Sequence, residues 1–157
     1  MITTRQAIIS DNEQIAVLFD CYRQFYHQAP DIFLAKTFIT ERIKNHESVI
    51  FVAETLTERS AENDAKQLIG FCQIYLGFCS VAAAKIGVLY DLFVVESARK
   101  LGAGRALMLA AHEYAKENGM ARLDLTTAKD NVTAQALYES LGWERDEVFY
   151  TYSKNLT

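Results

Sequence analysis

The chain has 157 residues, of which 50% are hydrophobic and 23% charged, and its formal net charge is −4 at pH 7. This length and composition predict one domain, residues 1–157, with enough apolar material for a sizeable core. The mild acidic excess argues against nucleic acid as a partner, because nucleic-acid binding needs cationic surfaces, and it agrees with a cationic substrate.

The chain lacks the apolar segments that membranes and secretion require. No run of eighteen apolar residues occurs, so no membrane partner is expected. The first stretch, MITTRQAIISDNEQ, is polar and charged where a signal peptide is apolar, which predicts a cytoplasmic protein. Cys21, Cys72 and Cys79 have no C-x-x-C spacing, so we expect buried, reduced thiols. Because the three histidines are scattered, we expect no metal site.

The first part of the chain predicts a strand and two helices. Residues 2–9 form the strand, and Ser10-Asp11-Asn12-Glu13 fits a capping box that begins a helix near Asp11. Pro30 ends this helix, since the residue before a proline disfavours helical geometry, and a second helix is expected over 31–45. Helical spacing predicts that the following side chains point inward: Ile15, Leu18, Phe19, Tyr22 and Phe25, then Leu34, Phe38 and Ile39.

The middle of the chain predicts an antiparallel meander. Strands are expected over residues 49–55, 67–78 and 86–95, and a polar loop over 58–66 joins the first two. Connections of hairpin length favour antiparallel pairing. Alternation along the second strand predicts two faces, with Phe71, Gln73 and Tyr75 on one and Cys72, Ile74 and Leu76 on the other.

The last part of the chain predicts two helices and two strands. A helix is expected from Gly104 to Asn118, with Leu107, Ala110, Ala111 and Tyr114 inward and Gly119 as its left-handed cap. A strand over 122–127 then lies parallel to the strand that ends at Val95, as a strand–helix–strand crossover requires. A helix over 131–141, closed by Gly142, and a final strand over 147–154 complete the chain.

The most informative stretch is LYDLFVVESARKLGAG, from Leu89 to Gly104, because it predicts a strand, a glycine turn and a helix start. Gly102 and Gly104 let the backbone approach a ligand, and the free N–H groups of the first helical turn can bind an anion. Positive charge on the same segment favours a phosphate, and it comes from Arg99, Lys100 and Arg105. The alternative is an ordinary tight turn with solvated cations.

A dinucleotide-binding turn is a second alternative. The preceding strand and Asp124, twenty residues beyond Gly104, favour it. Leu107 stands where the third glycine of G-x-G-x-x-G is required, and too little chain follows for a second mononucleotide-binding half. The balance of these features opposes the dinucleotide interpretation.

Two motifs together resemble the GNAT superfamily of N-acetyltransferases. Arg99-x-x-Gly102-x-Gly104 is similar to its (Q/R)-x-x-G-x-(G/A) signature, whose turn binds the pyrophosphate of acetyl-CoA. The segment DNVTAQALYESLGW is similar to a second family motif through Asn131, Ala134, Tyr138, Gly142 and Trp143. The resemblance covers about residues 2–156. It implies an α+β fold with a mainly antiparallel sheet, one parallel, splayed strand pair and about four helices.

The resemblance also implies the cofactor, acetyl-CoA, and the residues that bind it. Backbone N–H groups near Phe93, Val94 and Val95 would bond the acetyl oxygen and the pantetheine amides. Asn131 would bond the pantetheine, and Tyr138 would protonate the leaving thiolate; a helix cap and a packed tyrosine are the respective alternatives. The turn itself would bind the diphosphate through Arg99, Lys100, Leu101, Gly102, Ala103, Gly104 and Arg105.

An amine acceptor requires a group that handles its proton. An alkylammonium has a pKa of about 10.4, so about one molecule in two thousand is free amine at neutral pH. Asp91, on the same strand face as Phe93, is the candidate for holding the cation or accepting its proton. An ordinary Asp pKa of about 3.9 suits an anchor better than a direct base, and water can relay the proton. The alternative is a capped or ion-paired strand residue.

The acceptor side is predicted from resemblance alone. LYDLFVV looks like the LEDFFV-type strand of the spermidine/spermine and thialysine N-acetyltransferase subgroup, but Tyr90 stands where the first acid of the pair is expected. The loop between the first two helices would contribute Phe25, Tyr26 and Asp31 to the acceptor wall; core packing and helix capping are the alternatives. Tyr150 and Tyr152 would reach the same pocket, or are ordinary strand aromatics.

These features predict direct transfer of an acetyl group to a small-molecule amine such as a polyamine or an amino acid, in a ternary complex. A protein N-terminal or lysine acetyltransferase is one alternative, although the chain has no basic docking segment. A non-catalytic acyl-CoA-binding module is the other. The resemblance also implies that a homodimer can form.

Overall fold

The computed structural model describes residues 1–56 and 66–157. These residues form two compact units, Met1–Leu125 and Thr126–Thr157, which we describe separately. The loop expected over 58–66 lies outside the described residues, apart from its last residue. The single domain over 1–157 and the homodimer stay predictions.

The first unit is built on a five-stranded mixed sheet in the order β1-β2-β3-β4-β5. Its first three strand pairs are antiparallel, and β4 and β5 are parallel, as the sequence predicts. The strands are β1 (Ile2–Gln6), β2 (Ser48–Leu56), β3 (Lys66–Cys79), β4 (Ala84–Val94) and β5 (Arg122–Asp124).

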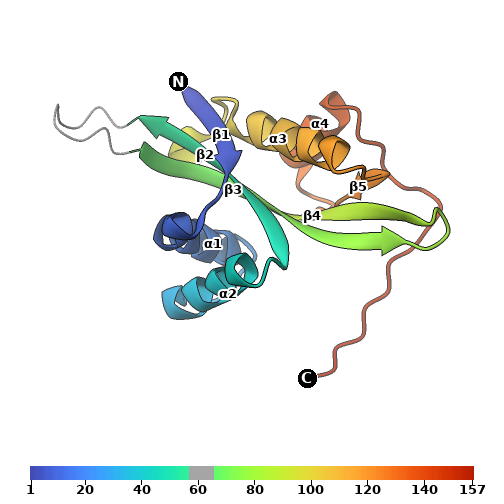
Figure 1. The fold of residues 1–157 in the computed structure, drawn as a ribbon, viewed down its shortest axis with the longest axis horizontal. Coiled ribbons are helices and arrows are strands. Elements are labelled where there is room, and N and C mark those ends of the chain that lie inside the picture. Colours follow the sequence, from blue (N-terminus) through green and yellow to red (C-terminus); the bar gives the residue numbers. More distant parts are fainter. Residues whose placement is uncertain (57–65) are drawn as a thin grey trace. The chain divides into compact units, whose positions relative to one another are not determined.

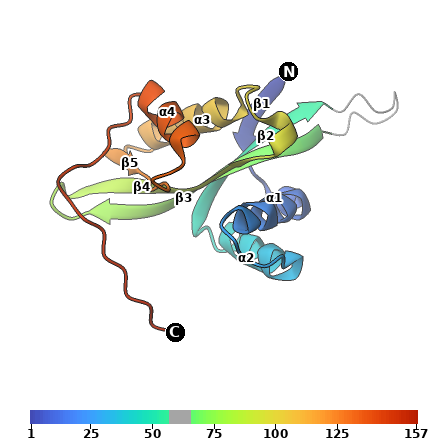
Figure 2. The same ribbon diagram turned by 180° about the vertical axis from the view of Figure 1, so that it is seen from behind.

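Three helices cover the two faces of this sheet. Helices α1 (Asn12–Phe25) and α2 (Ile32–Lys44) lie on one face and α3 (Ala103–Glu117) on the other (Figures 1 and 2). The first face contains the buried side chains of Ile15, Phe19, Ile39, Val52 and Phe71, and under α3 lie Leu107, Met108 and Ala111. Sequence spacing misses Met108, and it places Ala110 and Tyr114 too deep, since both are only half-buried.

The start of α1 differs from the predicted capping box. Ser10 lies in a short 3-10 turn, η1 (Ile9–Asp11), and caps nothing. The Asp11 carboxylate instead reaches back to the start of η1, where its Oδ2 accepts the Ile8 N–H at 2.8 Å, and it pairs with Arg5 at 2.7 Å. Asp11 is the N-cap residue of α1, but its side chain accepts no hydrogen bond from that helix.

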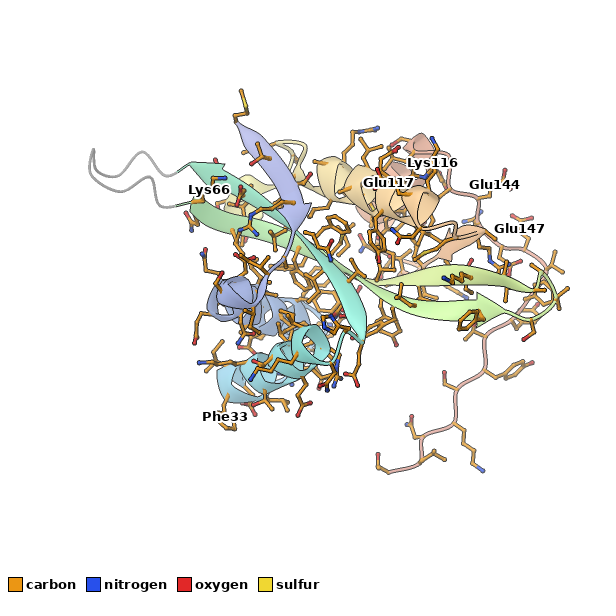
Figure 3. All side chains as sticks on the ribbon, in the orientation of Figure 1. Phe33, Lys66, Lys116, Glu117, Glu144 and Glu147 are labelled. Atoms are coloured by element: carbon orange, nitrogen blue, oxygen red, sulfur yellow. The ribbon has the colours of Figure 1, made fainter. Side chains whose placement is uncertain are left out.

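The α1–α2 connection is more exposed than the helical periodicity predicts. Asp31 caps α2 by accepting the Leu34 N–H at 2.9 Å. Phe25 is 50% exposed and Leu34 is 48% exposed, so their predicted burial is wrong. Phe33 points away from the sheet on the outer side of α2 (Figure 3). Both helix ends therefore present apolar side chains to solvent.

Strand β5 is shorter than predicted and pairs with β4 over three positions only, Ile86–Val88 with Arg122–Asp124. Gly87 makes this close approach possible, because a Cβ there would lie 2.6 Å from Leu123 and 2.8 Å from Ile74. Beyond Val88 the edge of β4 on this side has no partner strand in the described first unit.

The second unit contains α4 (Val132–Ser140). The Asn131 side chain caps this helix by accepting the Ala134 N–H at 3.3 Å, and Gly142 follows with a left-handed φ of 82°. The predicted strand over 147–154 is wrong: residues 143–157 form no strand in the structure. Asp146 Oδ1 instead accepts the N–H groups of Val148 and Phe149, which bends the backbone out of an extended course.

Two expectations about cysteines and membranes can be compared with the described residues. All three thiols are free, but only Cys72 is buried; Cys21 is exposed and Cys79 half-buried, so the prediction of buried thiols is wrong for two of them. No helix in residues 1–56 and 66–157 is long and apolar enough to cross a membrane.

Candidate active site

The open edge of β4 is the first component of the site. The Val95 N–H donates to the Ile69 carbonyl at 2.9 Å and therefore faces β3. Because N–H directions alternate along a strand, the N–H groups of Leu92 and Val94 face the other edge. That edge lies beyond the end of β5 pairing at Val88.

This geometry corrects part of the predicted cofactor contacts. The Val95 N–H is not free to bond a pantetheine amide, since β3 already accepts it. By the same alternation, the Phe93 N–H also faces β3, opposite Phe71. Val94 is the residue of the predicted trio whose N–H faces the open edge. Sequence reasoning finds the segment, but only the strand register shows which amides remain available.

The glycine turn is the second component. After a 3-10 turn, η2 (Glu96–Ala98), the Arg99 Nε donates to the Val94 carbonyl at 3.1 Å and fastens the turn to the end of β4. Lys100 and Gly102 then take left-handed φ values of 64° and 91°. No atom lies within 4 Å of the position that a Gly102 Cβ would occupy. The turn is therefore open at Gly102.

The N-terminus of α3 follows directly and has no side-chain cap. The N–H groups of Ala103 and Gly104 precede the first intrahelical bond, which Ala106 donates to Gly102. Ala103 is buried, so it can contribute only its backbone, while Leu101 is exposed. Uncapped amides, the helix dipole and nearby cationic residues fit the diphosphate of a CoA thioester.

A buried carboxylate, Asp91, is the third component. Its side chain is on β4, and the residue is only 4% exposed. Gln73 Nε2 donates to Asp91 Oδ2 at 2.6 Å. Burial raises the pKa of Asp91 above its usual value, and hydrogen bonds from Gln73 and Tyr22 oppose part of that rise. A raised pKa makes this carboxylate a better proton acceptor than an exposed aspartate.

A β-bulge beside Asp91 explains how the residue is placed. Gln73 pairs with Asp91 and Ile74 pairs with Leu89, so Tyr90 is the extra residue of β4. The Tyr22 hydroxyl donates to the Tyr90 carbonyl at 3.3 Å. Helix α1 is thereby linked to the bulge through Tyr22.

Gln73 is itself held by a second hydrogen bond. It is fully buried, and its Oε1 accepts the Ser48 hydroxyl at 2.6 Å. Ser48, Gln73 and Asp91 therefore form a hydrogen-bonded chain across three neighbouring strands. Sequence reasoning places Gln73 on the correct strand but assigns it no role, and it misses Ser48. The available signal is a single amide in the otherwise apolar run of β3.

Asp91 differs from the other buried carboxylates in having no cationic partner. Asp11 pairs with Arg5. Asp20 pairs with Arg23 at 3.1 Å, and Glu54 pairs with both Arg5 and Lys66. Among the described residues, no lysine, arginine or histidine forms an ion pair with Asp91. Its negative charge is uncompensated.

Tyrosines from α1 and from the sheet are influenced by this carboxylate. Burial, and then the charge of Asp91, raise the pKa of Tyr22 and Tyr26, and both effects help raise that of Tyr75 to about 12. The Tyr22 and Tyr26 rings lie 5.1 Å apart, and the Tyr75 and Tyr90 rings lie 5.6 Å apart. Tyr22 and Tyr75 are missed by the sequence reasoning, because each reads as a core position.

The remaining predicted residues divide between the two units. Phe25 and Tyr26 are partly exposed at the end of α1, with rings 5.2 Å apart. Asn131 and Tyr138 belong to the second unit. The Asn131 Oδ1 acts as a helix cap, and the half-buried Tyr138 ring lies 6.3 Å from that of Trp143. Tyr150 and Tyr152 are almost fully exposed.

Comparisons with known proteins agree with this fold and turn. Residues 13–143 match the acetyltransferase (GNAT) family. An uncharacterised N-acetyltransferase, YhfO, of Bacillus subtilis (strain 168) is 46% identical over 152 residues, which cover 97% of this chain and 96% of that protein. The crystal structure of a probable acetyltransferase matches with a TM-score of 0.86 and 32% identity, covering 99% of this chain and 98% of the other.

The chain therefore belongs to the GNAT acetyltransferase family. A ribosomal-protein-alanine N-acetyltransferase from Brucella melitensis biovar Abortus 2308 shares the fold, with a TM-score of 0.76 over 98% of this chain and 100% of that chain, at 18% identity. Enzymes of this family use acetyl-CoA as the acyl donor. The spermidine/spermine and thialysine subgroup stays a prediction.

Proposed function

We propose that this chain transfers the acetyl group of acetyl-CoA to a primary amine of a small molecule, by direct attack in a ternary complex. The observation that carries the proposal is Asp91, a buried carboxylate without a cationic partner in the described residues, in the part of β4 that lies beyond its pairing with β5. A substrate ammonium supplies the missing cation, and the same carboxylate can then accept its proton.

The glycine turn supports acetyl-CoA as the donor. Backbone N–H groups of Ala103 and Gly104 would hold the diphosphate, and the openness at Gly102 lets it approach. The Val94 N–H faces the side of β4 where the pantetheine arm would lie. The Asn131 amide nitrogen would bond the same arm, because only its Oδ1 is used as the helix cap.

The reaction requires three proton transfers. Asp91 holds the ammonium and takes one proton, which leaves the neutral amine that attacks the thioester carbon. A carbon–nitrogen bond forms, the carbon–sulfur bond breaks, and the leaving thiolate takes a proton from the Tyr138 hydroxyl. The second proton of the acetylated nitrogen then passes through water to the Tyr138 phenolate, which restores the hydroxyl. The role of Asp91 is supported by its burial and by the hydrogen bond from Gln73, and the role of Tyr138 is supported by its position in the family motif.

Binding and turnover can be tested separately. Acetyl-CoA should raise the melting temperature, whereas NAD and ATP should not, and thiol release should appear with a small amine. Tyr138→Phe should lower kcat by about 10² to 10⁴ with an unchanged acetyl-CoA Kd, as expected for an acid–base group. Unchanged kcat would remove Tyr138 from the mechanism. Stabilisation without thiol release from any amine or peptide would indicate a binding module instead.

A further inference from the structure

We propose that the acceptor is an organic monoamine with an apolar or aromatic body and no anionic group near its nitrogen, bound with its ammonium on Asp91 and its body between tyrosine rings. This inference rests on the proposed function and narrows it. It excludes amino acids as good acceptors, and it favours a single cation over a polyamine.

The charge of the acceptor follows from the groups around Asp91. Gln73 and Tyr22, which hydrogen-bond the carboxylate, are both neutral. An ammonium would therefore neutralise the site one to one. A second ammonium on the same molecule has no second unpaired buried carboxylate to bind, because each of the other three in the described residues already has a cation.

A carboxylate next to the amine finds no cation paired with Asp91 among the residues that the structure describes. Arg42 is a cation whose charge lowers the pKa of Tyr75, whereas the charge of Glu47 raises it. Arg42 is engaged elsewhere, since its Nε lies 2.6 Å from Glu47 and its guanidinium stacks 4.5 Å above the Phe38 ring. A substrate carboxylate would thus meet the charge of Asp91 without compensation.

The shape of the acceptor follows from the aromatic residues. Tyr22 and Tyr75 are half-buried beside Asp91, and Tyr26 and Tyr90 are 42% and 64% exposed further out. Tyr22 and Tyr26 come from the end of α1, and Tyr75 and Tyr90 come from β3 and β4. The Tyr22 hydroxyl donates to the Tyr90 carbonyl and links the two groups. Aromatic faces favour both a cation and an apolar body, so the rings extend the site outward from the carboxylate.

A matched set of amines tests this assignment. 2-Phenylethylamine and L-phenylalanine differ only by the carboxylate, and spermidine adds further ammonium groups to an aliphatic amine such as n-butylamine. We expect kcat/KM from thiol release to be at least 100-fold higher for 2-phenylethylamine than for L-phenylalanine, and spermidine to give no advantage over n-butylamine. A preference for either the amino acid or spermidine would overturn the inference while leaving the proposed function intact.

Substitutions of exposed tyrosines test the rings with little effect on folding. Tyr26→Leu and Tyr90→Leu should each lower kcat/KM for 2-phenylethylamine about 5- to 30-fold, in the range of a cation–π contact. Tyr90→Phe keeps the ring and should restore most of the loss. Phe78→Leu, at another exposed aromatic near the tip of the β3–β4 hairpin, should leave kcat/KM unchanged. Equal losses at Tyr90 and Phe78 would overturn the role of the rings.

Binding without turnover gives an independent readout. Calorimetric titration of the protein with 2-phenylethylamine alone should show binding. Asp91→Asn should abolish this binding, and L-phenylalanine should show no comparable binding to the wild-type protein. Binding that survives Asp91→Asn would overturn the assignment of the ammonium to this carboxylate. If acetyl-CoA stabilises the protein but none of the amines releases thiol, the proposed function fails, and the amine titration still decides whether the site recognises monoamines.

Discussion

Asp91 combines two properties that rarely occur together in one residue: its carboxylate is buried, and no cation balances it among the residues that the structure describes. Such a group destabilises the folded protein when it is ionised. A fold that keeps it gains a site that attracts a cation and accepts a proton. At the scale of the residue, Asp91 therefore lowers the stability of the fold and provides the group that the proposed reaction needs.

Asp91→Asn should stabilise the protein and inactivate it. The asparagine oxygen can still accept the Gln73 hydrogen bond, but it carries no charge. Because the folded pKa of Asp91 is raised, the wild-type protein loses stability as the pH rises from the unfolded-state pKa of about 3.9 to the folded-state pKa. At pH values above that window, the variant should be more stable than the wild type by about 1.4 kcal/mol for each unit by which the folded pKa of Asp91 is raised.

Urea unfolding of both proteins between about pH 4 and pH 8 checks this expectation. The advantage of Asp91→Asn should be small at the acidic end and should grow with pH until it levels off. A difference that stays constant over this range would contradict a titrating Asp91. Thiol release should fall by about 10² or more, because the group that handles the proton is absent.

Gln73 should set the pH dependence of the reaction through its contact with Asp91. Gln73→Glu places a second carboxyl group 2.6 Å from the first, and two carboxylates at that distance share a proton. The acidic limb of the kcat/KM profile should move to higher pH. Ser48→Ala, which removes the donor to Gln73 Oε1, should shift it less.

Gln67→Glu is the matched control, because it makes the same chemical change at an exposed position of the same strand. Its pH profile should coincide with that of the wild type. If Gln67→Glu and Gln73→Glu shift the acidic limb equally, the effect is one of net charge and not of the hydrogen-bonded chain.

At the scale of elements, the site depends on two interruptions of regular structure. The bulge at Tyr90 places Asp91 against Gln73, and the end of β5 leaves the N–H groups of Leu92 and Val94 without a strand partner. The start of α3, which has no side-chain cap, adds the N–H groups of Ala103 and Gly104. The free strand edge and the helix start thus present backbone N–H groups that a ligand can bind.

Gly102→Ala should weaken acetyl-CoA binding at least tenfold. Its left-handed φ of 91° costs a non-glycine residue about 1 kcal/mol, and the new methyl group would enter the open space that we propose for the diphosphate. Gly119→Ala is the matched control, since Gly119 also has a positive φ of 65° and open surroundings but follows the far end of α3.

Calorimetric titration with acetyl-CoA, together with urea unfolding, separates the two effects. Both variants should lose similar stability, and only Gly102→Ala should lose affinity. Equal affinities in the two variants would refute the placement of the diphosphate at this turn.

At the scale of the whole molecule, a charged network joins the N-terminal strand to the sheet. Arg5 on β1 pairs with Asp11 at 2.7 Å and with Glu54 on β2 at 2.9 Å, and Lys66 on β3 adds a third contact at 2.6 Å. Hydrogen bonds from Lys66 and Arg5 lower the pKa of Glu54, and Arg5 likewise lowers that of Asp11. Each buried carboxylate in this network has a cationic partner, whereas Asp91 has none among the described residues.

Arg5→Met should destabilise the protein by about 3 kcal/mol at neutral pH. Two buried carboxylates lose a partner, and the lower end of the range for broken buried pairs applies because Arg5 is itself 36% exposed. Since lowered carboxyl pKa values contribute stability above the unfolded-state pKa and lose it in acid, the difference should shrink as the pH falls below about 4.

Lys36→Met provides the comparison, because Lys36 pairs with the exposed Glu13 on the helical surface. Such surface pairs contribute at most about 1 kcal/mol. Urea unfolding of both variants should therefore give a much larger loss for Arg5→Met. Equal losses would show that the buried network adds nothing beyond a surface pair.

The local motifs of this chain are readable from sequence because each depends on neighbours along the chain. The strand, glycine turn and helix from Leu89 to Gly104, the Asp31 cap and the left-handed Gly119 and Gly142 all follow from short spacing. The predicted strand over 147–154 is wrong because alternation alone does not supply a partner strand. Likewise, helical periodicity does not show that Phe25 and Leu34 remain about half exposed.

The sequence by itself determined the family, the mixed sheet and the position of the glycine turn, since residue type and spacing specify these features. Only the tertiary structure decided which amides of β4 remain free, that Ser48 and Gln73 hold Asp91, and that this carboxylate lacks the cation its buried counterparts have. Strand register and burial depend on residues far apart in the chain, and no local pattern encodes the distance between them.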